Sequence, residues 1–225
     1  MFTKCHQSPI CNISIKWAIC IFCLIAFNAS GDSPELTLAE YAKTPFGNVL
    51  FLRHAFAPGM DANGRPDKFK IDDCATQRNL DSIGIDQATL IGNRFITNGI
   101  KFGIIYSSQW CRCLETAQLL DLGEVTREVS LNSGFGGLFN LDESVASLRI
   151  MLESLKHEEE LVLMVTHRNV ISAITGVDVK SGGAVAYNIK TKASTIISIE
   201  MLKSIQLCRL VISRSVFAST VSPAR

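Results

Sequence analysis

Two of the four histidines in the sequence stand directly after runs of apolar residues. His54 ends the segment VLFLRH, and His167 ends the segment LVLMVTH. Continuous apolar runs of this kind are typical of buried strands, and ligands bind where the carboxyl ends of parallel strands meet at one edge of a sheet. A single histidine in such a place is often only part of a core. Because two occur, we expect both imidazoles to face one pocket.

Arginine side chains accompany these histidines. Arg53 precedes His54, and Arg112 follows a third apolar segment, IIYSS, at the start of an expected helix. Two guanidiniums and two imidazoles at one place would repel each other unless an anion lay between them. A guanidinium matches phosphate oxygens with two parallel hydrogen bonds, so phosphate is the anion we expect.

The segments around these residues alternate between expected strands and expected helices. The expected strands are residues 47–52, 102–108, 124–129, 161–167, 184–189 and 194–201, and the expected helices are a short one within 33–45, then 80–99, 113–120, 143–160 and 168–175. In the helix over 80–99, the residues at helical spacing are Ile83, Ala88, Ile91 and Phe95. This alternation predicts an α/β fold of three layers, with a mostly parallel central sheet flanked by helices.

Composition limits the classes of function. The chain has 225 residues, of which 47% are hydrophobic, and a formal net charge of +1. That length and apolar content suit one compact domain with a sizeable core. The near-zero charge gives no support for nucleic-acid binding, so we expect no nucleic-acid partner.

The first thirty residues differ from the rest of the chain. Lys4 and Lys16 precede the apolar run at residues 17–27, and small and polar residues follow it. This pattern indicates a secretory signal peptide, with an uncleaved anchor, a buried helix or a mistaken start site as alternatives. We therefore divide the chain into a leader at 1–30, a domain at 31–201 and an unassigned tail at 202–225. We expect a periplasmic or secreted protein that contacts a membrane only if the leader is uncleaved.

Four of the eight cysteines lie outside the leader, at Cys74, Cys111, Cys113 and Cys208. The pair at positions 111 and 113 has no second pair at metal-binding spacing, so we expect no metal site. In an exported protein, Cys74 can form a disulfide with Cys111 or with Cys113. Buried free thiols are the alternative.

Four segments, taken in chain order, resemble the histidine phosphatase superfamily, which has the phosphoglycerate mutase-like fold. They are LRHA, CATQRNLDSIGIDQA, IYSSQWCRCLETA and VTHRNVISAITG, and the similarity covers about residues 47–190. The small bacterial branch that it resembles includes exported phosphatases of lipopolysaccharide-core sugars and phosphohistidine phosphatases. Ala55 replaces the glycine of the Arg-His-Gly signature, and Arg168 stands where relatives usually have an uncharged residue.

The resemblance implies a phosphomonoester hydrolase that uses neither a metal nor an organic cofactor. His54 would be the nucleophile, and Arg53, Arg112 and His167 would hold the phosphoryl oxygens. The expected partner is a small-molecule phosphate ester, such as a sugar or cell-envelope phosphate. A phosphohistidine protein phosphatase and a catalytically silent module that binds a phosphorylated ligand are the alternatives.

The residue that protonates the leaving group is the least defined. The sequence has no glutamate at the position that marks the mutases of the superfamily. Asp61, in the loop that follows His54, is our prediction for the general acid, and Asp73 is the second candidate. Either carboxylate can instead be a solvated loop residue.

Overall fold

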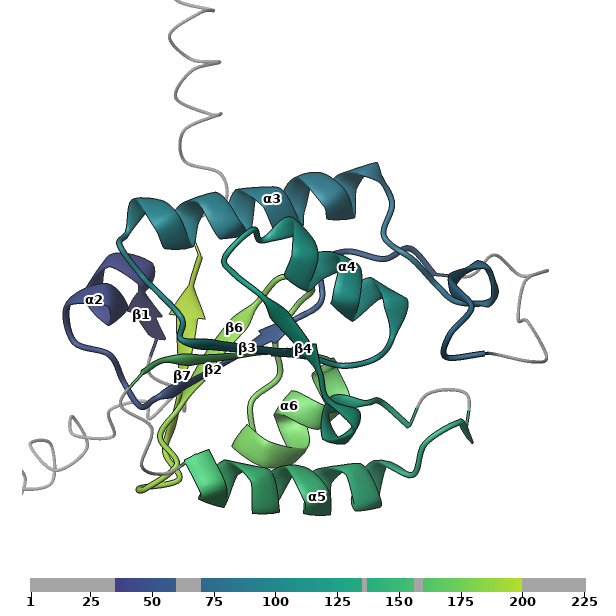
Figure 1. The fold of residues 1–225 in the computed structure, drawn as a ribbon. Coiled ribbons are helices and arrows are strands. Elements are labelled where there is room, and N and C mark those ends of the chain that lie inside the picture. Colours follow the sequence, from purple (N-terminus) through teal and green to yellow (C-terminus); the bar gives the residue numbers. More distant parts are fainter. Residues whose placement is uncertain (1–34, 60–69, 135–136, 156–159, 200–225) are drawn as a thin grey trace, which may run out of the picture. The chain divides into compact units, whose positions relative to one another are not determined.

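The computed structural model describes residues 35–59, 70–134, 137–155 and 160–199 (Figure 1). The chain separates into two compact units, Met1–Asp32 and Ser33–Arg225, and every described residue belongs to the second. The expected leader, the expected general acid Asp61 and the expected tail lie outside the described residues.

A seven-stranded sheet forms the middle of the described unit, with the strand order β1-β7-β6-β2-β5-β3-β4. The strands are β1 (Glu35–Thr37), β2 (Val49–Arg53), β3 (Ile104–Ser107), β4 (Val125–Arg127), β5 (Val162–Thr166), β6 (Ala184–Tyr187) and β7 (Ser194–Ser198). Among these strands only β6 is antiparallel to its neighbours, β2 and β7, and the other pairs are parallel. The prediction of a mostly parallel sheet is confirmed.

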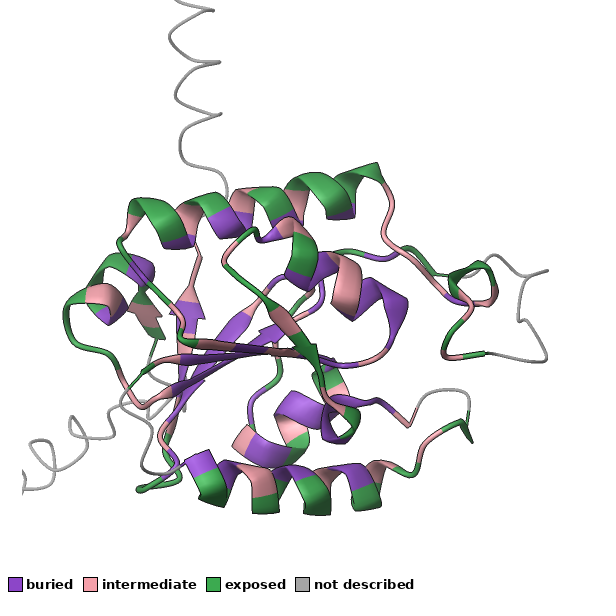
Figure 2. Ribbon diagram, in the orientation of Figure 1, coloured by how far each residue is buried: buried purple, intermediate pink, exposed green. Residues whose placement is uncertain are grey.

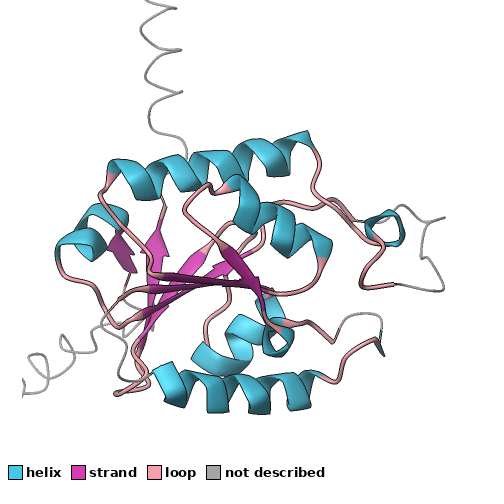
Figure 3. Cartoon of the chain, in the orientation of Figure 1, coloured by secondary structure: helices cyan, strands magenta, loops and turns pink. Residues whose placement is uncertain are grey.

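Helices cover both faces of this sheet (Figures 1 and 3). One face carries α2 (Leu38–Lys43), α3 (Ser82–Thr97) and α4 (Cys111–Leu119), and the other carries α5 (Leu141–Ser154) and α6 (Arg168–Thr175). Two short 3-10 helices, η2 (Cys74–Thr76) and η3 (Val129–Leu131), lie in the connections. The three-layer α/β class is therefore confirmed. None of the described helices has the length and apolar content needed to cross a membrane.

The core has two parts because each central strand points side chains to both faces. Leu50 and Leu52 of β2 pack in the cluster under α3 and α4, whereas Val49 and Phe51 pack in the cluster over α5 and α6. Figure 2 shows buried residues along the strands and on the inward faces of the helices. Two covered faces explain why the strands are continuous apolar runs rather than alternating ones.

Three details differ from the sequence expectations. Strand β1 was not predicted, since its three residues form no apolar run; it lies at the edge of the sheet and pairs with β7. Ile83 shares the helical spacing of Ala88, Ile91 and Phe95 but not their burial: it is 63% exposed, because it lies in the first turn of α3 on the outer side. The helix expected to reach residue 160 ends at Ser154, where Asn48 Nδ2 donates a 2.9 Å hydrogen bond to the carbonyl oxygen of Leu155.

The start of α3 contacts the backbone that follows β2. The Asp81 carboxylate accepts a 2.9 Å hydrogen bond from the Gly84 N–H and caps the helix. A Cβ atom at Gly84 would lie 1.9 Å from the carbonyl oxygen of Phe56. Gln87, one turn later, accepts a 2.8 Å hydrogen bond from the Phe56 N–H. The helix can support the exit of β2 only because position 84 has no side chain.

Gly84→Ala should therefore destabilise the protein, although alanine is the better helix former by about 1 kcal/mol. The new methyl group meets a backbone atom that cannot turn away, and overpacking of this kind costs roughly 1–3 kcal/mol. Urea unfolding measures the change. Asp86→Ala, at an exposed position of the same helix, is the control and should leave stability within about 0.5 kcal/mol of wild type. Equal stability of the two variants would contradict the contact.

Candidate active site

The ends of β2 and β5 bring the two histidines together. In this parallel pair Arg53 lies opposite Thr166, so the next residues, His54 and His167, leave the sheet side by side. The His54 N–H donates a 3.0 Å hydrogen bond to the Thr166 carbonyl oxygen. The centroids of the two imidazole rings are 5.5 Å apart.

A cavity of about 740 Å³ opens at this edge of the sheet. The histidines share its wall with four arginines and with residues from the connection before α5 and from α6. The lining residues are Arg53, His54, Arg78, Arg112, Ser133, Gly134, Leu141, His167, Arg168, Asn169, Ser172, Ala173 and Asp178. The structure thus places His54, Arg53, Arg112 and His167 around one cavity.

A backbone hydrogen bond fixes the proton of the His54 ring. Its Nδ1 lies 2.7 Å from the carbonyl oxygen of Ala55. A carbonyl can only accept, so Nδ1 carries the hydrogen and Nε2 keeps its lone pair. Burial, assisted by repulsion from Arg112, lowers the pKa of His54 to about 3. The ring is therefore neutral near pH 7, and the methyl group of Ala55 does not disturb the carbonyl that orients it.

A chain of buried hydrogen bonds fixes His167 in the opposite tautomer. Arg112 Nη2 lies 3.1 Å from His167 Nδ1 and must donate to it, so the hydrogen of His167 is on Nε2. Nε2 lies 2.9 Å from Ser108 Oγ, whose hydroxyl donates to Asn132 Oδ1 at 2.9 Å. Burial, with repulsion from Arg112, lowers the pKa of His167 well below its usual value. Ser108 and Asn132 were not predicted; the polar residues just after the apolar run of β3 were the available signal.

Three guanidiniums meet in the cavity with unused hydrogen-bond donors. The Nε atoms of Arg53, Arg78 and Arg112 are buried and have no hydrogen-bond partner. Burial lowers the pKa of Arg112 to about 10, and repulsion from the other two guanidiniums acts in the same direction. Arg112 is only 3% exposed and lies over the ring of Trp110, at 4.7 Å from its centroid. Buried donors without partners and clustered like charges are costly, and an anion in the cavity would offset the repulsion among the guanidiniums.

Arg78 belongs to this group but was not predicted from the sequence. Its backbone is tied to the start of α4 by a disulfide between Cys74 and Cys111, whose Cα atoms are 5.7 Å apart. Gln77 adds a hydrogen bond, since its Oε1 accepts from the Cys111 N–H at 2.9 Å. These two links hold Arg78 beside Arg112. Its place in the segment CATQRNLDSIGIDQA, which resembles the superfamily, was the available sequence signal.

The structure also decides between the cysteine pairings that the sequence left open. Cys111 forms the disulfide, and Cys113 is a buried free thiol. Its Sγ lies 3.4 Å from His167 Nε2. Burial raises the pKa of Cys113 to about 12, so the thiol stays protonated and packs as a small apolar group.

The carboxylates predicted from the sequence do not supply an acid within the described cavity wall. Asp73 caps η2 by accepting a 3.1 Å hydrogen bond from the Ala75 N–H and is not a lining residue. Asp61 lies outside the described residues. Among the described lining residues Asp178 is the one carboxylate, and the hydrogen bond from Arg168 lowers its pKa. Asp178 is therefore ionised near neutral pH and cannot donate a proton.

Comparison with known proteins gives similar folds at low sequence identity. No protein-family model and no curated protein matches the chain. The protein histidine phosphatase SixA, complexed with tungstate, has a TM-score of 0.45 and 15% identity, over 66% of this chain and 92% of its own. The phosphoserine phosphatase of Entamoeba histolytica has a TM-score of 0.46 and 17% identity, over 69% of this chain and 97% of its own. A mycobacterial glucosyl-3-phosphoglycerate phosphatase has a TM-score of 0.44 and 16% identity, over 61% of this chain and 90% of its own. At these TM-scores the matches carry no argument about function, which we infer from the structure and the sequence.

The neutral histidines predict a characteristic loss of stability in acid. A histidine with a lowered pKa in the folded state binds fewer protons than in the unfolded state when the pH lies between the two pKa values. The stability that neutral His54 maintains is complete above about pH 6.5 and is lost as the pH falls toward its folded pKa of about 3. Between about pH 5.5 and 4 the free energy of unfolding should fall less steeply with decreasing pH in His54→Gln than in wild type. The two slopes should differ by up to about 1.4 kcal/mol per pH unit. Urea unfolding at several pH values tests this, and parallel curves for the two proteins would contradict it.

The disulfide should matter for anion binding as well as for stability. Cys74→Ala should lower the free energy of unfolding by roughly 2–4 kcal/mol and weaken inorganic phosphate binding, because Arg78 loses one of its two links. Calorimetry with phosphate and urea unfolding measure the two effects. Wild type in reductant should reproduce the variant, whereas the variant itself should not respond to reductant. A wild type that keeps its phosphate affinity after complete reduction would contradict this role.

Proposed function

We propose that the protein is a phosphomonoester hydrolase of the histidine phosphatase superfamily and that it works through a phosphohistidine at His54. The observation that carries the proposal is the state of His54, a neutral ring with its Nε2 lone pair free beside three guanidiniums with unused donors. The order of the four resembling sequence segments supports the same conclusion.

In the first step His54 Nε2 attacks the phosphorus atom of the ester. The new N–P bond forms as the bond between phosphorus and the ester oxygen breaks. Positive charge develops on the ring, and the hydrogen bond from Nδ1 to the Ala55 carbonyl oxygen at 2.7 Å stabilises that charge. A neutral imidazole performs this attack without first losing a proton, so the lowered pKa of His54 suits the role.

The guanidiniums stabilise the transferring phosphoryl group, and His167 supports them, because its Nδ1 accepts from Arg112 Nη2 while its Nε2 hydrogen points to Ser108 Oγ. The transition state of the transfer spreads negative charge over three oxygens, and donors fixed in advance stabilise such charge most effectively. Arg112 is held by His167 and by the ring of Trp110, and Arg53 by a 2.9 Å hydrogen bond from Nη1 to the Val179 carbonyl oxygen. Binding also relieves the repulsion among the guanidiniums. We propose that no metal or organic cofactor takes part.

The second step and the leaving group require proton transfers. Water attacks the phosphohistidine, inorganic phosphate leaves, and His54 Nε2 regains its lone pair. An alkoxide leaving group needs a proton as its bond breaks, and ionised Asp178 cannot provide it. Asp61 remains our proposed donor.

We further propose that the substrate is a small-molecule ester, such as a sugar or cell-envelope phosphate, and that hydrolysis takes place outside the cytosol. A signal-peptide-like leader and the Cys74–Cys111 disulfide support export, since disulfides persist in oxidising compartments.

Two substitutions separate the nucleophile from the phosphate-binding groups. His54→Ala should remove turnover of an aryl phosphate but retain inorganic phosphate binding, because the guanidiniums remain. Arg112→Ala should lower kcat by roughly 10²–10³-fold, the effect of losing one fixed donor, and should weaken phosphate binding as well. Arg127→Ala, at an exposed arginine of β4 outside the cavity wall, is the matched control and should behave as wild type. Wild-type rates in His54→Ala would reject the proposed nucleophile.

A further inference from the structure

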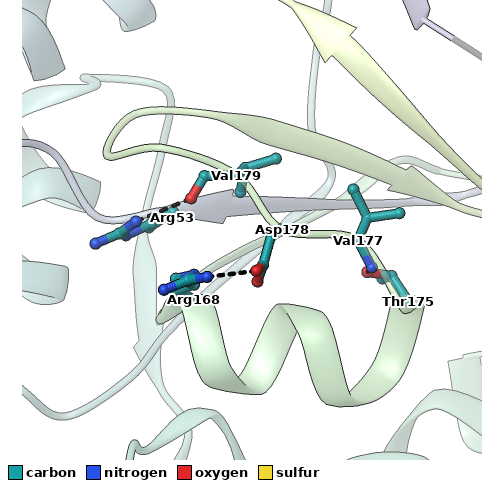
Figure 4. Close-up of polar contacts among 6 residues, drawn as sticks. All are labelled: Arg53, Arg168, Thr175, Val177, Asp178 and Val179. Atoms are coloured by element: carbon teal, nitrogen blue, oxygen red, sulfur yellow. Dashed lines mark hydrogen bonds and ion pairs between the residues drawn. The ribbon is translucent and has the colours of Figure 1, made fainter. Parts of the chain in front are cut away.

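The outer wall of the cavity carries an ion pair that the proposed phosphoryl transfer does not use. Arg168 Nη2 donates to Asp178 Oδ2 at 2.5 Å, as Figure 4 shows. The two side chains are 61% and 53% exposed, yet both residues line the cavity. An ion pair this exposed contributes little to stability, so stability does not account for its presence on the cavity wall.

The end of α6 brings Asp178 back toward Arg168. Gly176 adopts a left-handed conformation with a φ of 72° and ends the helix. Thr175 Oγ then accepts a 3.1 Å hydrogen bond from the Val177 N–H, and the chain returns along α6, so that Asp178 faces the first residue of the helix (Figure 4). The next residue, Val179, accepts the hydrogen bond from Arg53. One short segment thus serves both the proposed phosphate site and the ion pair.

This wall is suited to a leaving group that bears hydroxyl groups. The cavity volume of about 740 Å³ lies in the range of small-molecule sites, so it has room beyond a phosphoryl group. Two polar residues line the cavity beside the ion pair: the Asn169 amide donates to Ser133 Oγ at 3.2 Å, and the Ser172 hydroxyl forms a hydrogen bond with Asp178. A hydroxyl group can donate to a carboxylate and accept from a guanidinium, and it can therefore satisfy both members of the pair at once.

A second anionic group on the substrate would meet a different environment. It would approach Arg168 but also the carboxylate of Asp178, which the hydrogen bond from Arg168 and the charge of Arg53 keep ionised by lowering its pKa. Repulsion from that carboxylate offsets the attraction of the guanidinium. The wall therefore favours a neutral polyol over a phosphorylated acid.

We propose that Arg168 and Asp178 form a subsite that binds hydroxyl groups of a sugar or polyol leaving group, with Asp178 accepting hydrogen bonds and Arg168 donating them. The proposal rests on the phosphatase activity proposed above and assigns the substrate class of the same site. It also gives a role to Arg168, at a position where the resembling family usually has an uncharged residue.

Matched phosphate esters can test the subsite. Glucose 6-phosphate and ribose 5-phosphate carry hydroxyl groups, cyclohexylmethyl phosphate has a primary alkyl leaving group without them, and 3-phosphoglycerate carries a second anion. For wild type, we expect kcat/KM for the better sugar phosphate to exceed that for cyclohexylmethyl phosphate by about tenfold or more, the usual effect of a hydrogen bond to a charged group. Asp178→Ala should remove most of that ratio and should raise the ratio of 3-phosphoglycerate to cyclohexylmethyl phosphate, because Arg168 is freed. Asp178→Asn, which keeps one acceptor, should give kcat/KM ratios between those of wild type and those of Asp178→Ala.

The control variant is Glu153→Ala, which removes the carboxylate of another exposed ion pair, with Lys192, away from the cavity. It should leave every ratio as in wild type. Equal ratios in wild type and Asp178→Ala, or an equal loss on all substrates in that variant, would overturn the subsite while leaving the phosphatase function intact. If wild type hydrolysed none of these esters and no aryl phosphate, both the function and the subsite would be overturned.

Discussion

The register between β2 and β5 is the constraint on which the site depends. It sets Arg53 opposite Thr166 and so delivers the two histidines to the same point at the edge of the sheet. Apolar side chains on both faces would tolerate a slip of one residue better than a half-exposed strand would. Hydrogen bonds at the strand exit fix the register instead: the His54 N–H donates to the Thr166 carbonyl oxygen at 3.0 Å, and the Arg53 N–H donates to that of Gly183 at 3.0 Å. The neighbouring strands hold β2 from both sides where the chemistry begins.

This arrangement concentrates positive charge at one edge of the sheet, and the repulsion between those charges lowers the stability of the fold. Arg53, Arg78 and Arg112 share one cavity, and burial lowers the pKa of each, as it does for both histidines. The two hydrophobic clusters and the Cys74–Cys111 disulfide hold the structure against this repulsion. We expect a phosphoryl group in this cavity to relieve that repulsion, in line with the proposed function.

Local sequence patterns predicted the central strands and the positions of the two histidines that follow them. Apolar runs located the central strands, and the residues directly after them included His54 and His167. Residues that act through distant partners could not be found in this way: Arg78 is placed by a disulfide and by Gln77, and Asn132 reaches His167 only through Ser108. Helical spacing does not say where the first buried turn begins, and Ile83, at that spacing, is exposed. The Arg168–Asp178 pair spans ten residues around the end of α6, so it too needed the structure.

The most direct test of the account is the covalent state of His54 during turnover. The purified enzyme would be mixed with a radiolabelled phosphate ester, quenched within the first turnover under basic conditions and digested for peptide mapping. The account predicts an acid-labile, base-stable phosphoryl group on the peptide that contains His54, formed before inorganic phosphate and lost as phosphate appears. Release of phosphate in the first turnover with no label on His54 would mean direct attack by water and would contradict the proposed mechanism.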